Sequence, residues 1–218
     1  MLNEKTIWIS PTKKILVVSC YPQEIELIWK KDPIVNKKSL GVGNLEAALN
    51  LEELISHVPK IDGILLLGGA GAYSWARLSI GDFVFSDNIS SYGMGATMRF
   101  CRHIQGNRID KLNQNFFPTS PLIAKEWKEV LTNAPPEVTI QQMEKPPLVQ
   151  WSEFHVENTE AYGLAKVCKR RAIPFLSINR VTHIVGPEGY KQWTNNWRSL
   201  VDQLQVEIQK LMDFHTET

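Results

Sequence analysis

The chain has 218 residues, of which 24 are Lys or Arg and 23 are Asp or Glu, so its formal net charge is +1. This balance lacks the basic surplus typical of nucleic-acid-binding proteins and of proteins that bind anionic membrane surfaces. The length favours one domain, residues 1–218, over two small ones, and a domain of this size buries a full core without metal or disulfide staples.

Cysteine usage and the apolar runs predict the compartment. Cys20, Cys101 and Cys168 are odd in number and widely spaced, which argues against a disulfide framework and for a reducing environment. Residues 1–14 lack the apolar region of a signal peptide. The longest apolar run, residues 63–73, is far shorter than the roughly 20 residues that span a bilayer. We therefore expect a cytoplasmic protein with no membrane or nucleic-acid partner.

Strand and helix signals alternate in the first half of the chain. A β-branched run at 14–20 predicts a buried strand, and Pro22 then opens a helix that Pro33 ends. Gly41-Val-Gly43 predicts a turn, and Asn44 suits the N-cap of a helix that reaches residue 55. The most hydrophobic stretch, 61–67, predicts a central strand.

The second half predicts further alternation. Residues 81–87 alternate in hydropathy and predict a strand, whereas 93–120 is polar and weakly periodic and predicts a loop that includes one helix. The remaining elements are a helix at 125–133, a helix at 159–171, a strand at 173–179 and an amphipathic helix at 193–212. Together these elements predict an α/β protein, a central mixed β-sheet flanked by helices.

Isolated motifs are uninformative. Gly41-Val-Gly43 and Gly68-Gly-Ala-Gly71 resemble phosphate-binding loops, but neither completes a known nucleotide motif, and tight strand exits are the simpler interpretation. The five histidines show no paired metal-ligand spacing and no C-x-x-C occurs, so we expect no metal and no cofactor.

The order of the segments is more specific than any one of them. The segments are 19–28, Gly41-Val-Gly-Asn-Leu-Glu-Ala-Ala-Leu49, Leu65-Leu-Leu-Gly-Gly-Ala-Gly-Ala-Tyr73, 80–87, Val156-Glu-Asn-Thr-Glu-Ala-Tyr-Gly-Leu-Ala165 and 173–183. This order resembles the nucleoside phosphorylase and nucleosidase superfamily over about residues 14–212. The Gly-Ala-Gly-Ala-Tyr run, the strand exit from Ser19 to Glu24, and Val185-Gly-Pro187 followed by Trp193 are most similar to futalosine hydrolases. Methylthioadenosine/S-adenosylhomocysteine nucleosidases are the near relatives.

The resemblance implies cleavage of an N-ribosidic bond through an oxocarbenium-like sugar. It implies that Glu24 activates the water; from the residues alone, a solvated helix-start Glu is the preferred interpretation, and Glu26 is an alternative. It implies that Glu160 holds the ribose hydroxyls, with Glu157 as the alternative in register. The Glu-Met pair that the family has before this Glu is replaced here by Asn158 and Thr159, so that substrate-binding subsite is altered.

Two positions depart from the family pattern. His183 stands where nucleosidases carry the Asp that protonates the leaving purine, and Asn179 stands where the family often has Arg. An imidazole can donate a proton near neutrality, so His183 is either the replacement for that acid or a structural hydrogen-bonding residue.

The phosphate and base subsites are also implied by the resemblance. Leu66 and Gly69 occupy the positions of the phosphate-binding Arg and Ser of hexameric phosphorylases, so both contacts are missing and water is favoured as nucleophile. The alternative phosphate ligands are Arg77, Arg99 and Arg102.

Gly69, Ala70 and Gly71 are expected to line the ribose pocket. Phe154, or alternatively Trp151, is expected over the base, and the stripe of Trp193 and Trp197 in the core.

The sequence thus predicts a nucleosidase that releases the free base from a purine nucleoside-like substrate. Futalosine, which would place the enzyme in menaquinone biosynthesis, or a 6-amino analogue is the first candidate. A phosphate-dependent phosphorylase and a non-catalytic nucleoside-binding homologue are the alternatives. The resemblance also implies a homodimer, with residues 93–120 and Trp75 as interface candidates.

Overall fold

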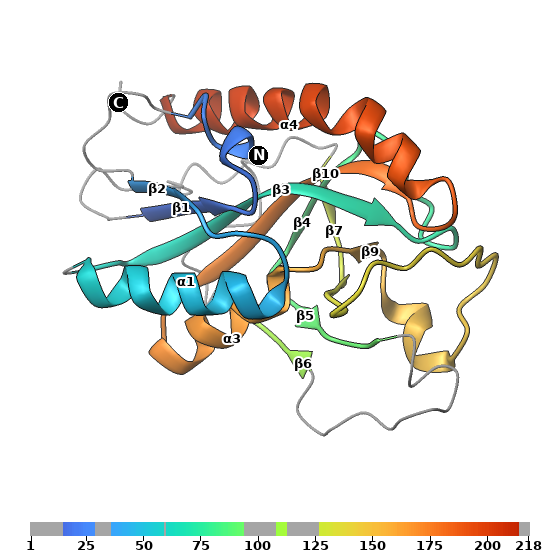
Figure 1. The fold of residues 1–218 in the computed structure, drawn as a ribbon, viewed down its shortest axis with the longest axis horizontal. Helices are drawn as coiled ribbons and strands as arrows, with labels where there is room; N and C mark the ends of the chain where they lie inside the picture. Colours follow the sequence, from blue (N-terminus) through green and yellow to red (C-terminus); the bar gives the residue numbers. More distant parts are fainter. Residues whose placement is uncertain (1–14, 29–35, 59, 94–107, 113–126, 214–218) are drawn as a thin grey trace, which may run out of the picture.

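The computed structural model describes residues 15–28, 36–58, 60–93, 108–112 and 127–213. In these ranges a mixed sheet of ten strands lies between helices on both faces (Figure 1), which confirms the predicted fold class. The strands are β1 (Ile15–Ser19), β2 (Asn36–Ser39), β3 (Gly63–Ala72), β4 (Phe83–Ser86), β5 (Ile89–Ser90), β6 (Arg108–Ile109), β7 (Lys128–Glu129), β8 (Thr132–Asn133), β9 (Val156–Glu157) and β10 (Phe175–Ile184). The helices are α1 (Asn44–His57), α3 (Ala161–Arg171) and α4 (Gly189–Asp213), with 3₁₀ turns η1 (Pro22–Glu24) and η2 (Val149–Glu153).

Strand β3 is the centre of the sheet and has three neighbours. β10 runs parallel to it along nearly its whole length. On its other edge β3 pairs first with β1, in parallel, and then with β9, antiparallel. The β1 pairing ends at Leu66 and the β9 pairing begins at Gly71. Among the described residues, the intervening stretch of this edge, residues 67–70, therefore has no strand partner.

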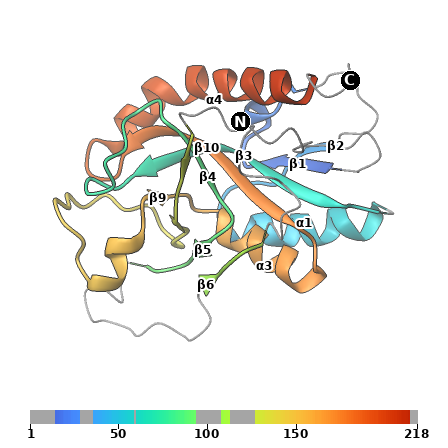
Figure 2. The same ribbon diagram turned by 180° about the vertical axis from the view of Figure 1, so that it is seen from behind.

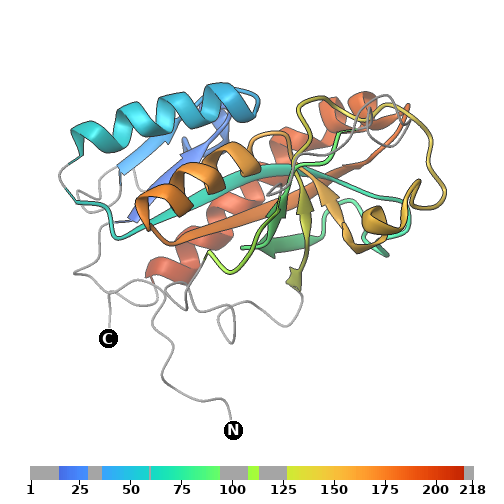
Figure 3. The same cartoon turned by 90° about the horizontal axis from the view of Figure 1, so that it is seen from below.

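The helices form two layers, one on each face of the sheet. α4 covers one face, where Leu204 and Ile208 pack against Leu176 and Ile178 of β10. α1 and α3 cover the other face and lie side by side (Figures 2 and 3). The amphipathic pattern of each helix turns its apolar side to the sheet, as expected for a two-sided α/β core. No helix in the described ranges combines the length and apolarity needed to cross a membrane.

Three predicted elements differ from the structure. The helix after Pro22 is only the 3₁₀ turn η1, and the remainder of its predicted span beyond residue 28 lies outside the described residues. The glycine run is not a strand exit, because β3 continues through it to Ala72. The helix predicted at 125–133 is replaced in its described part by β7 and β8, which pair with β4, β5 and β9. Its helix-like apolar spacing is overridden by these tertiary pairings.

Most of the other elements agree with the prediction. α1, α3, β4 and α4 lie where they were expected, and β10 continues five residues past the predicted end at 179, to Ile184. α1 begins at Asn44 with Gly43, rather than Asn44, at the N-cap. Most of the polar segment 93–120 lies outside the described residues.

Gly163 of α3 sets the close approach of α1 and α3. A Cβ at this position would lie 2.0 Å from the backbone oxygen of Asn44, and the Gly163 amide donates to Asn44 Oδ1 at 2.8 Å. Helix propensity alone predicts that Gly163→Ala stabilises the protein by about 0.5–1 kcal/mol. Because the added methyl group would clash with the backbone of α1, we expect Gly163→Ala instead to lower the free energy of unfolding by about 1–3 kcal/mol. Urea unfolding measures this change, and Lys166→Ala, at an exposed position of the same helix, is the control. A stabilised Gly163→Ala variant would contradict this packing.

Candidate active site

In the stretch of β3 at residues 67–70, side chains rather than a neighbouring strand form hydrogen bonds with the backbone. The Gly69 amide donates to Glu24 Oε1 at 3.3 Å, and the Gly69 carbonyl accepts from Asn158 Nδ2 at 3.1 Å. A Cβ at Gly68 would lie 3.0 Å from Glu24 Oε1, and one at Gly69 would lie 2.9 Å from Thr182 Cγ2. The glycines therefore let functional side chains approach the sheet from both sides, which explains why they lie within a strand.

Glu24 ends η1, directly after β1, and its carboxylate is buried at 5% exposure. Its Oε2 accepts from the amides of Cys20, at 3.1 Å, and Tyr21, at 3.0 Å. The pKa of Glu24 is raised to about 7, chiefly by burial and also by nearby Glu160, against the amide hydrogen bonds, which lower it. A carboxyl group with a pKa near neutrality suits general acid–base chemistry.

Glu160 immediately precedes α3 and is likewise buried. Its Oε1 accepts from the Gly43 amide at 3.1 Å and from the Thr159 hydroxyl at 2.7 Å. Asn158 lies two residues before the N-cap Glu160, and its Oδ1 accepts from the amides of Glu160 and Ala161. The carboxylate is thus held by the glycine turn before α1 and by the start of α3, two segments far apart in the sequence.

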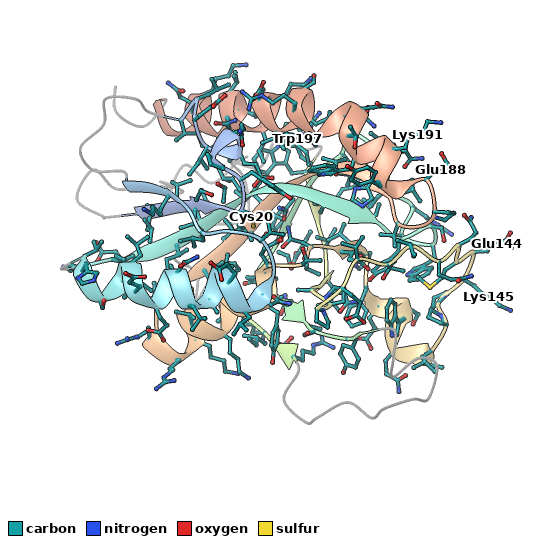
Figure 4. The ribbon with its side chains drawn as sticks, viewed as in Figure 1. Cys20, Glu144, Lys145, Glu188, Lys191 and Trp197 are labelled. Carbon is teal, nitrogen blue, oxygen red and sulfur yellow. The ribbon has the colours of Figure 1, made fainter. Side chains whose placement is uncertain are left out.

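Cys20 joins the two carboxylates. It follows β1, lies near the centre of the ribbon in Figure 4 and is buried. Burial raises the pKa of its thiol well above the usual value, and the charges of Glu160 and Glu24 and a hydrogen bond with Glu160 act in the same direction. The thiol therefore stays protonated and acts as a neutral donor to Glu160, rather than as a nucleophile.

Glu157 is a third buried carboxylate, but its oxygens are already used. Oε2 accepts from the hydroxyls of Tyr73, at 2.9 Å, and Thr139, at 2.6 Å. Oε1 accepts from the Thr139 amide at 2.9 Å, and Asn133 Nδ2 donates to the Tyr73 hydroxyl. Burial raises the pKa of Glu157 despite these donors. This network ties the segment around Thr139 to β9, so Glu157 is a weaker candidate than Glu160 for holding a substrate.

His183 lies near the end of β10, after a register shift in the pairing with β3. Glycines make room for its ring: a Cβ at Gly71 would lie 2.5 Å from His183 Nε2, and one at Gly189 would lie 3.1 Å from Cδ2. Burial lowers the pKa of His183 to about 4. The imidazole is therefore neutral near pH 7, and the imidazolium needed to protonate a leaving base is scarce.

These groups converge on one cavity of about 300 Å³. Small-molecule sites commonly enclose roughly 300–1,000 Å³, so this volume suits a compact ligand. The three carboxylates line it, and none of its described lining residues is Lys or Arg. Within the described ranges, no three His, Cys, Asp or Glu side chains gather closely enough to hold a metal ion. A cavity of this charge favours a cationic transition state and disfavours an inorganic anion.

Most of the predicted site residues lie together. Glu24, Glu160, His183, Gly69, Ala70, Gly71, Asn158 and Thr159 all line the cavity. Phe154 does not: it is buried in a cluster with Trp151 and Tyr73, and its carbonyl accepts from Trp75 Nε1. Of the alternative phosphate ligands, Arg77 is not among the lining residues, and Arg99 and Arg102 lie outside the described residues.

The aromatic wall of the cavity comes from elsewhere. Tyr21, Tyr190 and Trp193 line it. Trp193 stacks on Trp197 at 5.3 Å between ring centroids and lies 6.0 Å from both tyrosine rings. The prediction that Trp193 is a core residue is therefore wrong. The spacing of Tyr190, Trp193 and Trp197 along one side of a helix was the available signal, but the same spacing is also typical of core packing.

The comparison with family models and the comparison with curated proteins gave no match. Solved structures do match. Futalosine hydrolase of Helicobacter pylori is 13% identical, with a TM-score of 0.72 over 92% of this chain and 97% of that one. A putative 5′-methylthioadenosine/S-adenosylhomocysteine nucleosidase from Francisella philomiragia is 15% identical, with a TM-score of 0.74 over 92% and 99%. One from Borrelia burgdorferi, bound to adenine, is 15% identical, with a TM-score of 0.71 over 92% and 99%.

These matches cover nearly the whole of each chain at low identity, so they establish the architecture rather than the chemistry. The resemblance inferred from the order of the sequence segments is confirmed at that level. The chain therefore shares its fold with this futalosine hydrolase and these putative nucleosidases.

Proposed function

We propose that this chain, acting as a single domain, is an N-ribosyl hydrolase that cleaves the glycosidic bond of a purine nucleoside-like substrate. One observation carries the proposal: two buried carboxylates, Glu24 and Glu160, share a nucleoside-sized cavity whose described lining has no cationic side chain. Such a lining stabilises a positively charged sugar, which is the species that N-ribosidic cleavage must pass through.

Glu24 is the general base in this proposal. Its pKa of about 7 leaves a substantial ionised fraction at neutral pH, and its ionised form accepts a proton from the attacking water. Three backbone amides fix the carboxylate in place, so little reorganisation is needed when the proton moves. The water adds to the anomeric carbon as the bond to the base breaks, and the base departs with the bonding electrons.

Glu160 is the ribose ligand in this proposal. A carboxylate accepts hydrogen bonds from two neighbouring hydroxyls at once, and its charge stabilises the developing oxocarbenium ion. The bonds from Gly43 and Thr159 both end on Oε1. We place the substrate hydroxyls at Oε2, on the side of the carboxylate away from these two donors, with the Cys20 thiol as a further donor to Glu160.

Water rather than phosphate is the proposed nucleophile. The Gly69 amide, on the edge of β3 that has no described strand partner, already donates to Glu24. Leu66, at the position of a phosphate-binding Arg, is buried in the apolar core. Both features support hydrolysis over phosphorolysis.

Three finer parts of the proposal rest on the resemblance. The substrate is futalosine, from menaquinone biosynthesis, or a 6-aminopurine nucleoside such as 5′-methylthioadenosine. The enzyme works in the cytoplasm. It acts as a homodimer, which the exposed apolar side chains of Val42, Val138, Ile140 and Tyr190 beside the cavity support.

The test is release of free base by the purified protein from 5′-methylthioadenosine, adenosine, inosine and futalosine, each with and without phosphate. We expect release from at least one of them at a rate that phosphate does not change, measured by chromatography. Turnover that requires phosphate would identify a phosphorylase instead. Binding of a nucleoside with no turnover of any would identify the non-catalytic homologue, a role to which the scarcity of protonated His183 also points.

A further inference from the structure

The turn that carries Glu24 is short. η1 is a single 3₁₀ turn of three residues, in which the Glu24 amide donates to the Tyr21 carbonyl at 3.0 Å and the Ile25 amide donates to the Pro22 carbonyl at 3.3 Å. A turn of this length is marginal by itself in water, because ordering the backbone costs more than so few hydrogen bonds return. The position of Glu24 therefore depends on what η1 packs against, and η1 lies against α4 (Figure 1).

Gln205 of α4 binds the backbone on either side of Glu24. Its Oε1 accepts from the Leu27 amide at 2.8 Å, and its Nε2 donates to the Gln23 carbonyl at 3.0 Å. The Gln205 side chain is buried, with a residue exposure of 0%. A buried amide that satisfies both a carbonyl and an N–H of one short segment fixes the position of that segment and also its orientation.

Two other contacts join this segment to α4, but they are less directional. Glu26 forms an ion pair with Arg198, and the two side chains are 43% and 42% exposed, so the pair contributes little. Ile25 belongs to the same apolar cluster as side chains of α4, and apolar packing does not by itself set an orientation. Of these contacts, the two hydrogen bonds of Gln205 are the ones that orient the turn.

The orientation of η1 determines whether the Glu24 carboxylate reaches β3. Glu24 Oε1 lies 3.3 Å from the Gly69 nitrogen, at the long end of the range for a hydrogen bond. A Cβ at Gly68 would lie 3.0 Å from the same oxygen, so the carboxylate is seated closely on the strand backbone. A shift of the turn by about 1 Å away from β3 would break the bond to Gly69, and misplacement on this scale costs about 100-fold in the rate of an enzyme.

We propose that Gln205 is a positioning residue, which holds η1 against α4 and thereby keeps the Glu24 carboxylate on the backbone of β3. Gln205 is not among the residues that line the cavity, so it acts through Glu24 rather than on a substrate. The same helix supplies Tyr190 and Trp193 to the cavity wall. α4 thus fixes the general base and the aromatic wall relative to each other. The kinetic consequence of this inference rests on the proposed function, whereas its structural consequence does not.

The kinetic test uses Gln205→Met, which keeps the length of the side chain and removes both hydrogen bonds. We expect kcat for base release to fall about 10–100-fold and KM to change less than about threefold, because the groups that line the cavity are untouched. In a Glu24→Gln background the same substitution should have almost no further effect on kcat, since it acts through Glu24. Gln205→Asn, a shorter amide, should give a smaller loss in the same direction. Glu26→Gln, which breaks the exposed link between the same two elements, is the matched control and should keep the wild-type kcat.

Hydrogen exchange of the full-length protein detects the displacement without any turnover. The Gly69 amide lies on β3, and its acceptor is Glu24, so Gln205→Met should speed its exchange about tenfold relative to the other amides of β3. Glu26→Gln should leave it unchanged.

Two results would overturn the inference and leave the hydrolase proposal intact. One is unchanged exchange of the Gly69 amide in Gln205→Met, and the other is an equal loss of kcat from Gln205→Met in the wild-type and Glu24→Gln backgrounds. If the wild type released no base from any nucleoside, the proposed function would fail, and exchange at Gly69 would still decide whether Gln205 positions Glu24.

Discussion

Glu24→Gln should lower the rate of free-base release by about 10²–10⁴-fold, the usual contribution of a general base, while leaving nucleoside binding largely intact. The amide keeps the size of the carboxylate but takes no proton from water. Steady-state kinetics on the best substrate measures the loss. Glu26→Gln is the matched control. Glu26 lies two residues further on, is exposed and forms an ion pair with Arg198 on α4. The Glu26→Gln variant should therefore release base at the wild-type rate.

The pH dependence of kcat/KM should also differ between the wild type and Glu24→Gln. Glu24 must be ionised to act, so kcat/KM of the wild type should rise as the pH increases toward the pKa of about 7 and then level off. The Glu24→Gln variant should lose this rise. A wild-type profile that falls through the same range would assign Glu24 as an acid instead. Full activity of Glu24→Gln at every pH would remove it from the mechanism.

Glu160→Gln is the second large effect, and we expect kcat/KM to fall about 10–1,000-fold, because hydrogen bonds to charged groups and transition-state charge stabilisation are both lost. The variant is structurally conservative, since the remaining Oε1 still accepts from Gly43 and Thr159. In the wild type, 2′-deoxy and 3′-deoxy analogues should each be poorer substrates. In the variant the penalty for removing either hydroxyl should shrink.

The Glu157→Gln variant tests which of the two carboxylates, Glu157 or Glu160, binds the ribose hydroxyls, a choice that the sequence pattern left open. Both Glu157 oxygens are bonded to Tyr73 and Thr139, so this change should lower thermal stability more than it lowers kcat/KM. If the deoxy analogues instead lost their penalty in Glu157→Gln and kept it in Glu160→Gln, the two roles would be reversed.

Local sequence patterns predicted the central elements because burial and periodicity agree there. The β-branched run of β1 and the apolar run of β3 are buried on both faces, and the apolar stripe of α4 lies against them. The segment at 125–133 failed because Trp127, Val130 and Leu131 are spaced as in a helix. Their strand pairing depends on β4 and β9, which lie far away in sequence.

The candidate site was predicted from the order of its segments rather than from any one residue. Glu24 and Glu160 each look like an ordinary acid at a helix start, and only the fold brings both to one cavity. The aromatic wall could not be predicted, because the side of α4 that carries Trp193 depends on where the helix begins relative to β10. Phe154 illustrates the converse: the resemblance implies that its ring lies over the base, but the ring packs in a buried cluster with Trp151 and Tyr73.

The open edge of β3 makes a proton-binding group part of the sheet itself. A neighbouring strand would satisfy the Gly69 amide with a carbonyl whose charge never changes, whereas Glu24 does so with a carboxylate that titrates. Its pKa is raised in the folded state, so the protonated form is the one that folding favours. The stability associated with that proton is fully present below about pH 4.5 and declines as the pH rises through about 7. Near neutrality the chain therefore gives up folding free energy to keep the carboxylate ionised.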